Sequence, residues 1–159
     1  MSYTLTMSEP RWLDATQQRH WRAYVDGSVR LTEIMDRDLK TKHGLSVSEY
    51  EILVRLSEAP ERRLRMAELA DNASQSRSRL SHTCSRLESK GLVMRDSCPN
   101  DKRGVFAHLT DAGFAALERA ARDHVETVRT YLIDVVEPND LEAIGRAFSA
   151  VLKRMGATG

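Results

Sequence analysis

Residues 66–90 carry the pattern that most constrains the fold of this chain. A short helix-forming stretch at 66–71 is followed by a two-residue turn at 72–73 and by a longer helical stretch that begins at Ser74. Serine commonly precedes the first turn of a helix because its hydroxyl accepts a backbone N–H, and Gly91 is placed to end the second stretch. A short helix, a tight turn and a longer helix form the helix–turn–helix pattern.

A β-hairpin is predicted directly after this pattern. Residues 92–96 and 104–109 are short and rich in β-prone side chains, and the polar segment 97–103, with its Pro-Asn-Asp sequence, separates them. Two short strands around a polar turn are typical of a hairpin. A hairpin next to a helix–turn–helix predicts a mainly α-helical fold with a small β-hairpin wing, the winged helix–turn–helix.

Long helices are predicted on both sides of this winged segment. Apolar residues recur at steps of three and four from Pro10 onward, until Gly44 provides a stop. Ser46 and Glu49 then form a capping box for the next helix. After the hairpin, two more amphipathic helices follow, and the second opens at Pro138.

The helix pattern divides the chain into two regions. We expect a helical dimerisation region from residues 10–45 and 110–156, a winged DNA-binding domain at 46–109, and a flexible arm at 1–9. The first helix and the last two each carry a wide apolar face, which is more than one winged domain can cover. Burial against a second copy with two-fold symmetry is the simplest solution, and a closed monomeric bundle is the alternative.

The net charge of +1 hides an uneven distribution. Residues 61–103 contain ten lysines and arginines against six acidic residues, an excess of four positive charges. Residues 111–143 contain eight acidic residues against three arginines, an excess of five negative charges. A basic segment between neutral and acidic ones suits a local contact with a polyanion, and ordinary charge on solvated helix faces is the alternative.

One side of the longer predicted helix carries hydrogen-bond donors and no acid. On a helical wheel Leu80, Cys84 and Leu87 share the other side, which we expect to face the core. In this motif the second helix lies in the major groove, where arginine can contact guanine with two hydrogen bonds. The donor-rich half, which we call the recognition face, contains Gln75, Ser78, Arg79, Ser81, His82, Ser85 and Arg86.

Three segments resemble the MarR family of transcriptional regulators. Residues 80–95 (LSHTCSRLESKGLVMR) resemble its run from recognition helix to first wing strand, residues 101–103 (DKR) with 109–113 (LTDAG) resemble its wing signature, and 66–70 (MAELA) also fits. The resemblance implies a DNA-binding homodimer, usually a repressor, that is often released by a small ligand or by thiol oxidation. The Ser/Arg-rich segment 75–79 departs from the family's more mixed sequence, which bears on the operator that is read.

The residues expected to contact double-stranded DNA come from this helix and from the hairpin. Lys102 and Arg103 at a β-turn can reach into a minor groove, and an Asp101–Arg103 pair that only braces the turn is the alternative. We expect Arg77, nearer the core edge, to contact phosphate. The complete predicted set is Ser74, Gln75, Ser76, Arg77, Ser78, Arg79, Ser81, His82, Arg86, Asp101, Lys102 and Arg103.

The resemblance also implies an effector pocket between the dimerisation helices and the winged domain. Trp21, Arg22, Tyr24, His43 and Tyr50 come from segments that would border such a pocket. Aromatic walls with one or two polar groups suit a small aromatic or phenolic ligand. The alternative is that these aromatic side chains belong to the core.

A thiol-redox-responsive regulator is an alternative to ligand control. Cys98 lies near Arg95 and Lys102 in the sequence, and nearby cations lower the pKa of a thiol. Redox-sensing members of the resembled family place their cysteine in the first helix, where this chain has none. Cys84 is expected to be buried.

The sequence offers little support for a metal-binding or catalytic function. The five histidines are scattered without metal-binding spacing, and there is no GxSxG, HExxH, P-loop or GxGxxG motif. We therefore expect no metal, no cofactor and no catalytic site, with a helical protein-interaction module as the alternative to a regulator. No apolar run approaches a membrane span and no secretory signal is apparent, so we expect a cytoplasmic protein.

Overall fold

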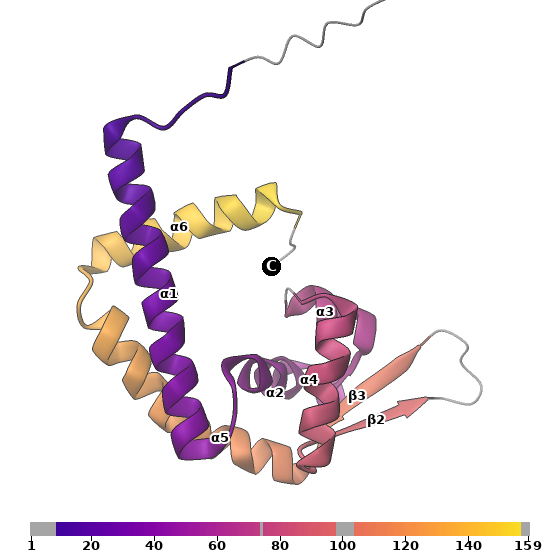
Figure 1. Ribbon diagram of the computed structural model, residues 1–159. Helices are drawn as coiled ribbons and strands as arrows, with labels where there is room; N and C mark the ends of the chain where they lie inside the picture. The colour runs from indigo at the N-terminus through magenta and orange to yellow at the C-terminus, as the bar shows by residue number, and fades with distance from the viewer. Residues whose placement is uncertain (1–8, 74, 98–103, 157–159) are drawn as a thin grey trace, which may run out of the picture.

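The computed structural model describes residues 9–73, 75–97 and 104–156. It is mainly α-helical with a small antiparallel sheet, which confirms the predicted fold class (Figure 1). No helix in these ranges is long and apolar enough to cross a membrane. The elements are α1 (Ala15–His43), α2 (Val47–Glu58), the 3-10 turn η1 (Pro60–Arg62), β1 (Arg63–Arg65), α3 (Met66–Asn72), α4 (Arg77–Ser89), β2 (Val93–Ser97), β3 (Val105–Leu109), α5 (Asp111–Val128), the π-helical turn η2 (Arg129–Ile133) and α6 (Pro138–Arg154).

Helix α1 begins later than predicted. The Asp14 side chain accepts the Gln17 backbone N–H at 2.8 Å, and the Gln17 side chain accepts the Asp14 N–H at 3.0 Å. This reciprocal pair satisfies two donors that the first turn leaves free. The helix therefore begins at Ala15, and the predicted start at Pro10 is wrong.

The junction between α1 and α2 follows the predicted signals. Gly44 ends α1 with φ at 65°, a left-handed conformation that favours glycine. The Ser46 backbone N–H donates to the Glu49 carboxylate at 2.8 Å, and the Glu49 N–H donates to the Ser46 hydroxyl at 3.1 Å, which confirms the capping box. The Val47 N–H donates to the Asp36 carboxylate at 3.0 Å and so ties the start of α2 to the side of α1.

The hydrophobic core lies around α2, which contacts α1, α3, α4, α5 and β3. On α2 itself Ile52, Leu53 and Leu56 are completely buried. Because the core includes α1 and α5 residues, it joins these helices to the winged segment. Its other buried members include Leu39, Leu45, Leu69, Leu80, Cys84, Leu87, Val93, Ala107, Leu109 and Leu117.

The sheet has the strand order β1-β3-β2 and is antiparallel throughout. Strands β2 and β3 are the predicted hairpin, with Val93 opposite Leu109. Strand β1 was not predicted, because a three-residue segment shows no alternation of its own and becomes a strand only by pairing with β3. Across this pairing the guanidinium of Arg63, on β1, lies 3.9 Å from the centre of the Phe106 ring, on β3.

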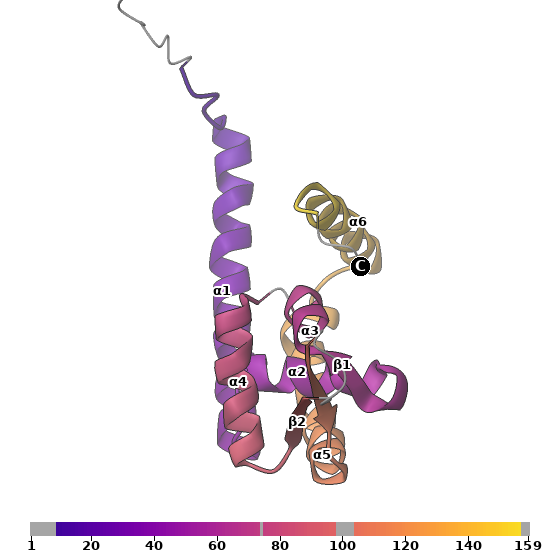
Figure 2. The ribbon, with the colours of Figure 1, turned by 90° about the vertical axis from the view of Figure 1, so that its right-hand side faces the viewer.

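Helices α1, α5 and α6 extend beyond the winged segment. Helix α5 packs along the carboxyl-terminal half of α1, and α6 crosses the amino-terminal half (Figure 1). Seen from the side, α6 stands apart from the winged segment (Figure 2). The described part of α6 has no buried residue and touches α1 through rings, with Tyr24 and Phe148 centroids 5.3 Å apart.

Candidate nucleic-acid interface

Helix α4, the longer helix of the helix–turn–helix, has its predicted buried side. Leu80, Cys84 and Leu87 are at most 1% exposed, as expected from the wheel. Thr83 is buried as well, and its hydroxyl donates to the Arg79 carbonyl at 3.0 Å. The opposite side of α4 is therefore the one that faces away from the core.

The start of α4 differs from the prediction by two residues. The Ser76 hydroxyl accepts the Arg79 backbone N–H at 3.2 Å, so the helix begins at Arg77. Ser76, rather than Ser74, is the N-cap, and Ser74 itself lies outside the described residues. The cap leaves Gln75 just before the helix, half-buried, with its backbone N–H donating to the Ala70 carbonyl.

The recognition face carries unpaired cations as well as hydroxyl groups. Ser78, Arg79, His82 and Ser85 are exposed, and none of these four residues is acidic. Within the described residues, neither Arg79 nor the neighbouring Arg77 has an ion-pair partner. Free guanidinium groups on an exposed helix can donate to phosphates and to base edges.

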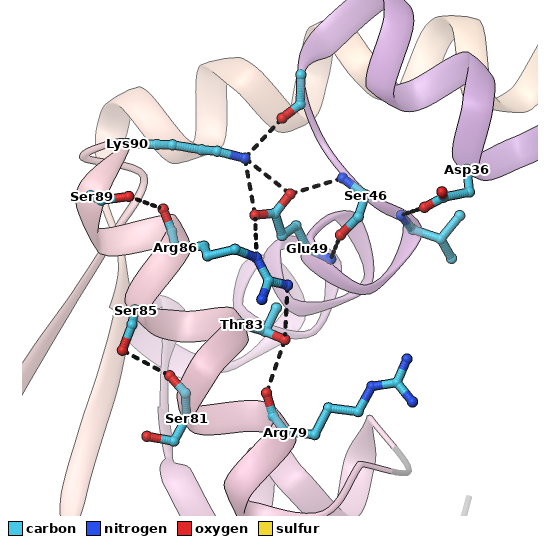
Figure 3. Close-up of polar contacts among 12 residues, drawn as sticks. Asp36, Ser46, Glu49, Arg79, Ser81, Thr83, Ser85, Arg86, Ser89 and Lys90 are labelled. Carbon is cyan, nitrogen blue, oxygen red and sulfur yellow. Dashed lines mark hydrogen bonds and ion pairs between the residues drawn. The ribbon is translucent and has the colours of Figure 1, made fainter.

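Arg86 lies on the same face but points back toward the protein. Its Nε donates to the Glu49 carboxylate at 3.3 Å and its Nη2 to the Thr83 hydroxyl at 3.4 Å (Figure 3). The same carboxylate accepts Lys90, with Nζ 3.0 Å from each oxygen. The predicted set of DNA contacts therefore includes one arginine whose side chain is already bonded to Glu49 and Thr83 in the absence of DNA.

Arg95, which is not among the predicted DNA contacts, braces the hairpin against α4. Its backbone N–H and Nε donate to the Glu88 carboxylate at 2.9 and 2.8 Å, and Nη2 donates to the Ser85 hydroxyl at 3.0 Å. The hydrogen bond from Arg95 lowers the pKa of Glu88 and raises that of Arg95. An i,i+7 contact between a helix and the following strand has no local signature, so only the fold reveals it.

A concavity lies between the start of α4 and the strands of the sheet. It has a volume of about 410 Å³, and Arg65, Arg77 and Arg95 contribute to its wall together with Ser81 and Gly104. The predicted contacts Asp101, Lys102 and Arg103 come between β2 and β3 in the sequence and lie outside the described residues. In this wall Arg77 has no ion-pair partner among the described residues, whereas Arg95 is paired with Glu88.

The structure does not bring the five predicted ligand-binding residues together within one chain. Trp21 and Tyr24 line a groove against α6, and Arg22 is exposed on α1. His43 bonds to Asp123 through Nε2 at 2.7 Å, whereas Tyr50 is buried against the His124 ring, 4.5 Å between centroids. The alternative that these aromatic residues belong to the core holds for Tyr50 alone.

The two cysteines lie in different situations. Cys84 is completely buried, as expected, and burial raises the pKa of its thiol to about 11. A thiol with this pKa stays protonated near neutral pH and is a poor nucleophile. Cys98, the predicted redox residue, lies outside the described residues.

Comparison with known proteins identifies the family. The MarR family model matches residues 45–105. The structure is similar to that of Sco3205 from Streptomyces coelicolor, a MarR family transcriptional regulator solved in complex with DNA, with 44% identity and a TM-score of 0.88 over 92% of this chain and 91% of that one. It is also similar to AbsC from the same organism, a MarR family transcriptional regulator, with 39% identity and a TM-score of 0.87 over 94% of this chain and 100% of that one.

A curated relative agrees over a shorter length. The HTH-type transcriptional regulator PecS of Dickeya dadantii is 34% identical over 113 residues. The match covers 65% of this chain and 64% of PecS, so the chain spans less than two thirds of that relative. Together with the winged helix–turn–helix and the two structures matched over nearly their whole length, this similarity shows that the chain belongs to the MarR family of transcriptional regulators.

Proposed function

We propose that the protein is a transcriptional repressor that binds duplex DNA as a homodimer, with α4 of each copy in the major groove. The observation that carries this proposal is the acid-free recognition face, on which Arg79 is exposed and unpaired among the described residues. Helix α4 has the position of the recognition helix in this motif. The DNA complex of the similar regulator Sco3205 supports the same use of the fold.

The proposed homodimer rests on apolar surface that a single chain leaves uncovered. A groove of about 760 Å³ between α1 and α6 is lined by Trp21, Tyr24, Ile144, Phe148 and Val151. These five side chains are between 39% and 55% exposed. Large contiguous apolar patches are rare on monomers, and two-fold pairing covers such a patch on both copies at once.

Two-fold symmetry has a direct consequence for the DNA sequence. Two recognition helices related by a dyad read half-sites about one helical turn, or 10 bp, apart in a pseudo-palindrome. Occupation of such an operator at a promoter would block the polymerase. Release by a small aromatic or phenolic ligand stays a prediction, since within one chain its five residues lie apart.

Selection of bound duplexes from a random pool tests the proposal. Enrichment of a pseudo-palindrome with half-site centres about 10 bp apart is expected, because each recognition helix reads one half. Binding should weaken steeply as salt is raised, because phosphate neutralisation releases counterions. A pool that stays unenriched through successive rounds would refute DNA recognition, and enrichment of a single half-site would refute the dimer.

A further inference from the structure

A buried carboxylate lies directly beneath the DNA-facing helix. Glu49, on α2, is 3% exposed, yet it lies within hydrogen-bonding distance of three donors, one at the start of α2 and two from α4 and its C-cap. These are the Ser46 backbone N–H, the Arg86 Nε and the Lys90 Nζ. Burying one charge is favourable only when its partners satisfy it, and this carboxylate is satisfied largely by α4.

The cluster connects three elements that lie apart in the sequence. Besides Glu49, Lys90 Nζ also donates to the carbonyl of Gly44, the residue that ends α1, at 2.8 Å. The end of α4 is therefore fixed both to α2 and to the α1–α2 junction (Figure 3). Since α1 belongs to the proposed dimerisation region, the cluster lies where that region meets the recognition helix.

The two arginines of the recognition face differ in their relation to this cluster. Arg86 uses Nε on Glu49 and Nη2 on Thr83, whereas the Arg79 side chain extends away from the cluster (Figure 3). Thr83 is itself held, because its hydroxyl donates to the Arg79 carbonyl. The orientation of Arg86 thus depends on a residue that lies 37 positions earlier in the chain.

We infer that Glu49 is a positioning residue for DNA recognition. Its carboxylate holds the Arg86 guanidinium away from the bases and prevents it from binding DNA phosphates irrespective of sequence. This inference rests on the proposed DNA-binding function. The DNA sequence is then recognised by the unpaired residues of the recognition face, and Arg79 is the principal cation among them. The carboxylate also offsets the charge of Lys90, so α4 presents less positive charge than its sequence suggests.

Substitution of Glu49 by Gln tests this role, because the amide keeps the size of the side chain and removes its charge. Arg86 and Lys90, which are 53% and 37% exposed, are then free to move toward DNA. We expect binding to a scrambled duplex to strengthen about fivefold and the slope of log K against log salt to steepen by about one phosphate contact. The ratio of operator to scrambled affinity should fall about tenfold.

Three further variants make this test specific. Glu51→Gln is the matched control, since Glu51 lies on the same helix and pairs with Arg55 at 2.7 Å, away from α4. It should leave both affinities within about twofold of wild type. Arg86→Gln in the wild-type background should change operator affinity by less than about threefold, and added to Glu49→Gln it should reverse most of the gain on scrambled DNA.

Each outcome has a definite consequence. A Glu49→Gln protein that matches Glu51→Gln in salt slope and selectivity overturns the positioning role, as does equal weakening on both duplexes. If Glu49→Gln does not give a folded circular dichroism spectrum, Arg86→Gln decides alone, and a tenfold loss of operator affinity there overturns the inference. A wild-type protein that binds neither duplex refutes the proposed function itself.

Discussion

Arg79 and Arg86 show how residues two turns apart on one helix acquire different roles. Both are exposed on the same acid-free face of α4, but among the described residues only Arg86 has a carboxylate partner. Arg79 keeps all its guanidinium donors available, since no described residue pairs with them. A free guanidinium can form the two parallel hydrogen bonds that distinguish guanine.

Replacement of Arg79 by Ala should therefore weaken operator binding by about 1–3 kcal/mol. Arg79→Lys should restore part of the affinity but little of the discrimination, because an ammonium group cannot form the bidentate contact. Titration of operator and single-base variants at one salt concentration measures both quantities. A loss of under roughly 0.3 kcal/mol for Arg79→Ala would show that another face of α4 meets the DNA.

The packing of α5 on the winged segment depends on one glycine. A Cβ atom at Gly113 would lie 2.0 Å from the backbone oxygen of Leu92 and 2.7 Å from a Leu109 side-chain carbon. Because a backbone oxygen cannot move aside as a flexible side chain does, Gly113→Ala should shift the start of α5 and destabilise the fold by about 2 kcal/mol. Thermal unfolding followed by circular dichroism measures the change.

Gly27 provides the matched control for this substitution. It also lies in a helix, but a Cβ atom there would meet nothing within 4 Å. Gly27→Ala should leave the melting temperature unchanged or raise it, because alanine is favoured over glycine inside helices by about 1 kcal/mol. Equal melting temperatures for the two variants would contradict the close approach of Gly113 to Leu92.

The contact between α2 and α5 contains a half-buried histidine. The ring of His124 lies against Tyr50, and its Nδ1 is buried without a hydrogen-bond partner among the described residues. Burial lowers the pKa of His124, although the charge of Glu51 opposes the shift. The folded protein therefore holds this imidazole neutral over a pH range in which the unfolded chain protonates it.

The sign of the resulting pH dependence follows from linkage. Above the ordinary histidine pKa of about 6.5, His124 is neutral in both the folded and the unfolded protein. As the pH falls below this value the free energy of unfolding decreases, because the unfolded chain binds the proton more tightly than the folded protein does. His124→Phe should remove part of the fall in unfolding free energy between pH 7 and pH 5, measured by urea titration. An unchanged pH profile for His124→Phe would contradict the assignment.

At the scale of the whole molecule, the described part of α6 has no buried residue, although one side of this helix is apolar. We expect Val151→Glu, which places a charge in the α1–α6 groove, to shift the sedimentation coefficient from dimer to monomer and to weaken operator binding by more than tenfold. Ser149→Glu adds the same charge on α6 outside the groove lining and should stay dimeric. A dimeric Val151→Glu protein would show that the groove is not the interface.

Features that depend on near neighbours in the chain could be predicted from the amino-acid sequence alone. The stop at Gly44, the capping box of Ser46 and Glu49, and the buried side of α4 were all predicted and confirmed. Each is set within a turn or two of helix, where capping geometry and the 3.6-residue period leave few options. The hairpin, with its polar turn between β-prone segments, belongs to the same class.

Which of these local features act together became clear only from the packing of the folded chain. It assigned Arg86 to Glu49, made β1 a strand by pairing it with β3, and separated Trp21 from Tyr50. These outcomes depend on contacts between residues far apart in the chain, for which periodicity and spacing carry no signal. A side chain's partner is fixed by which elements the core brings side by side, and that is a property of the packed molecule.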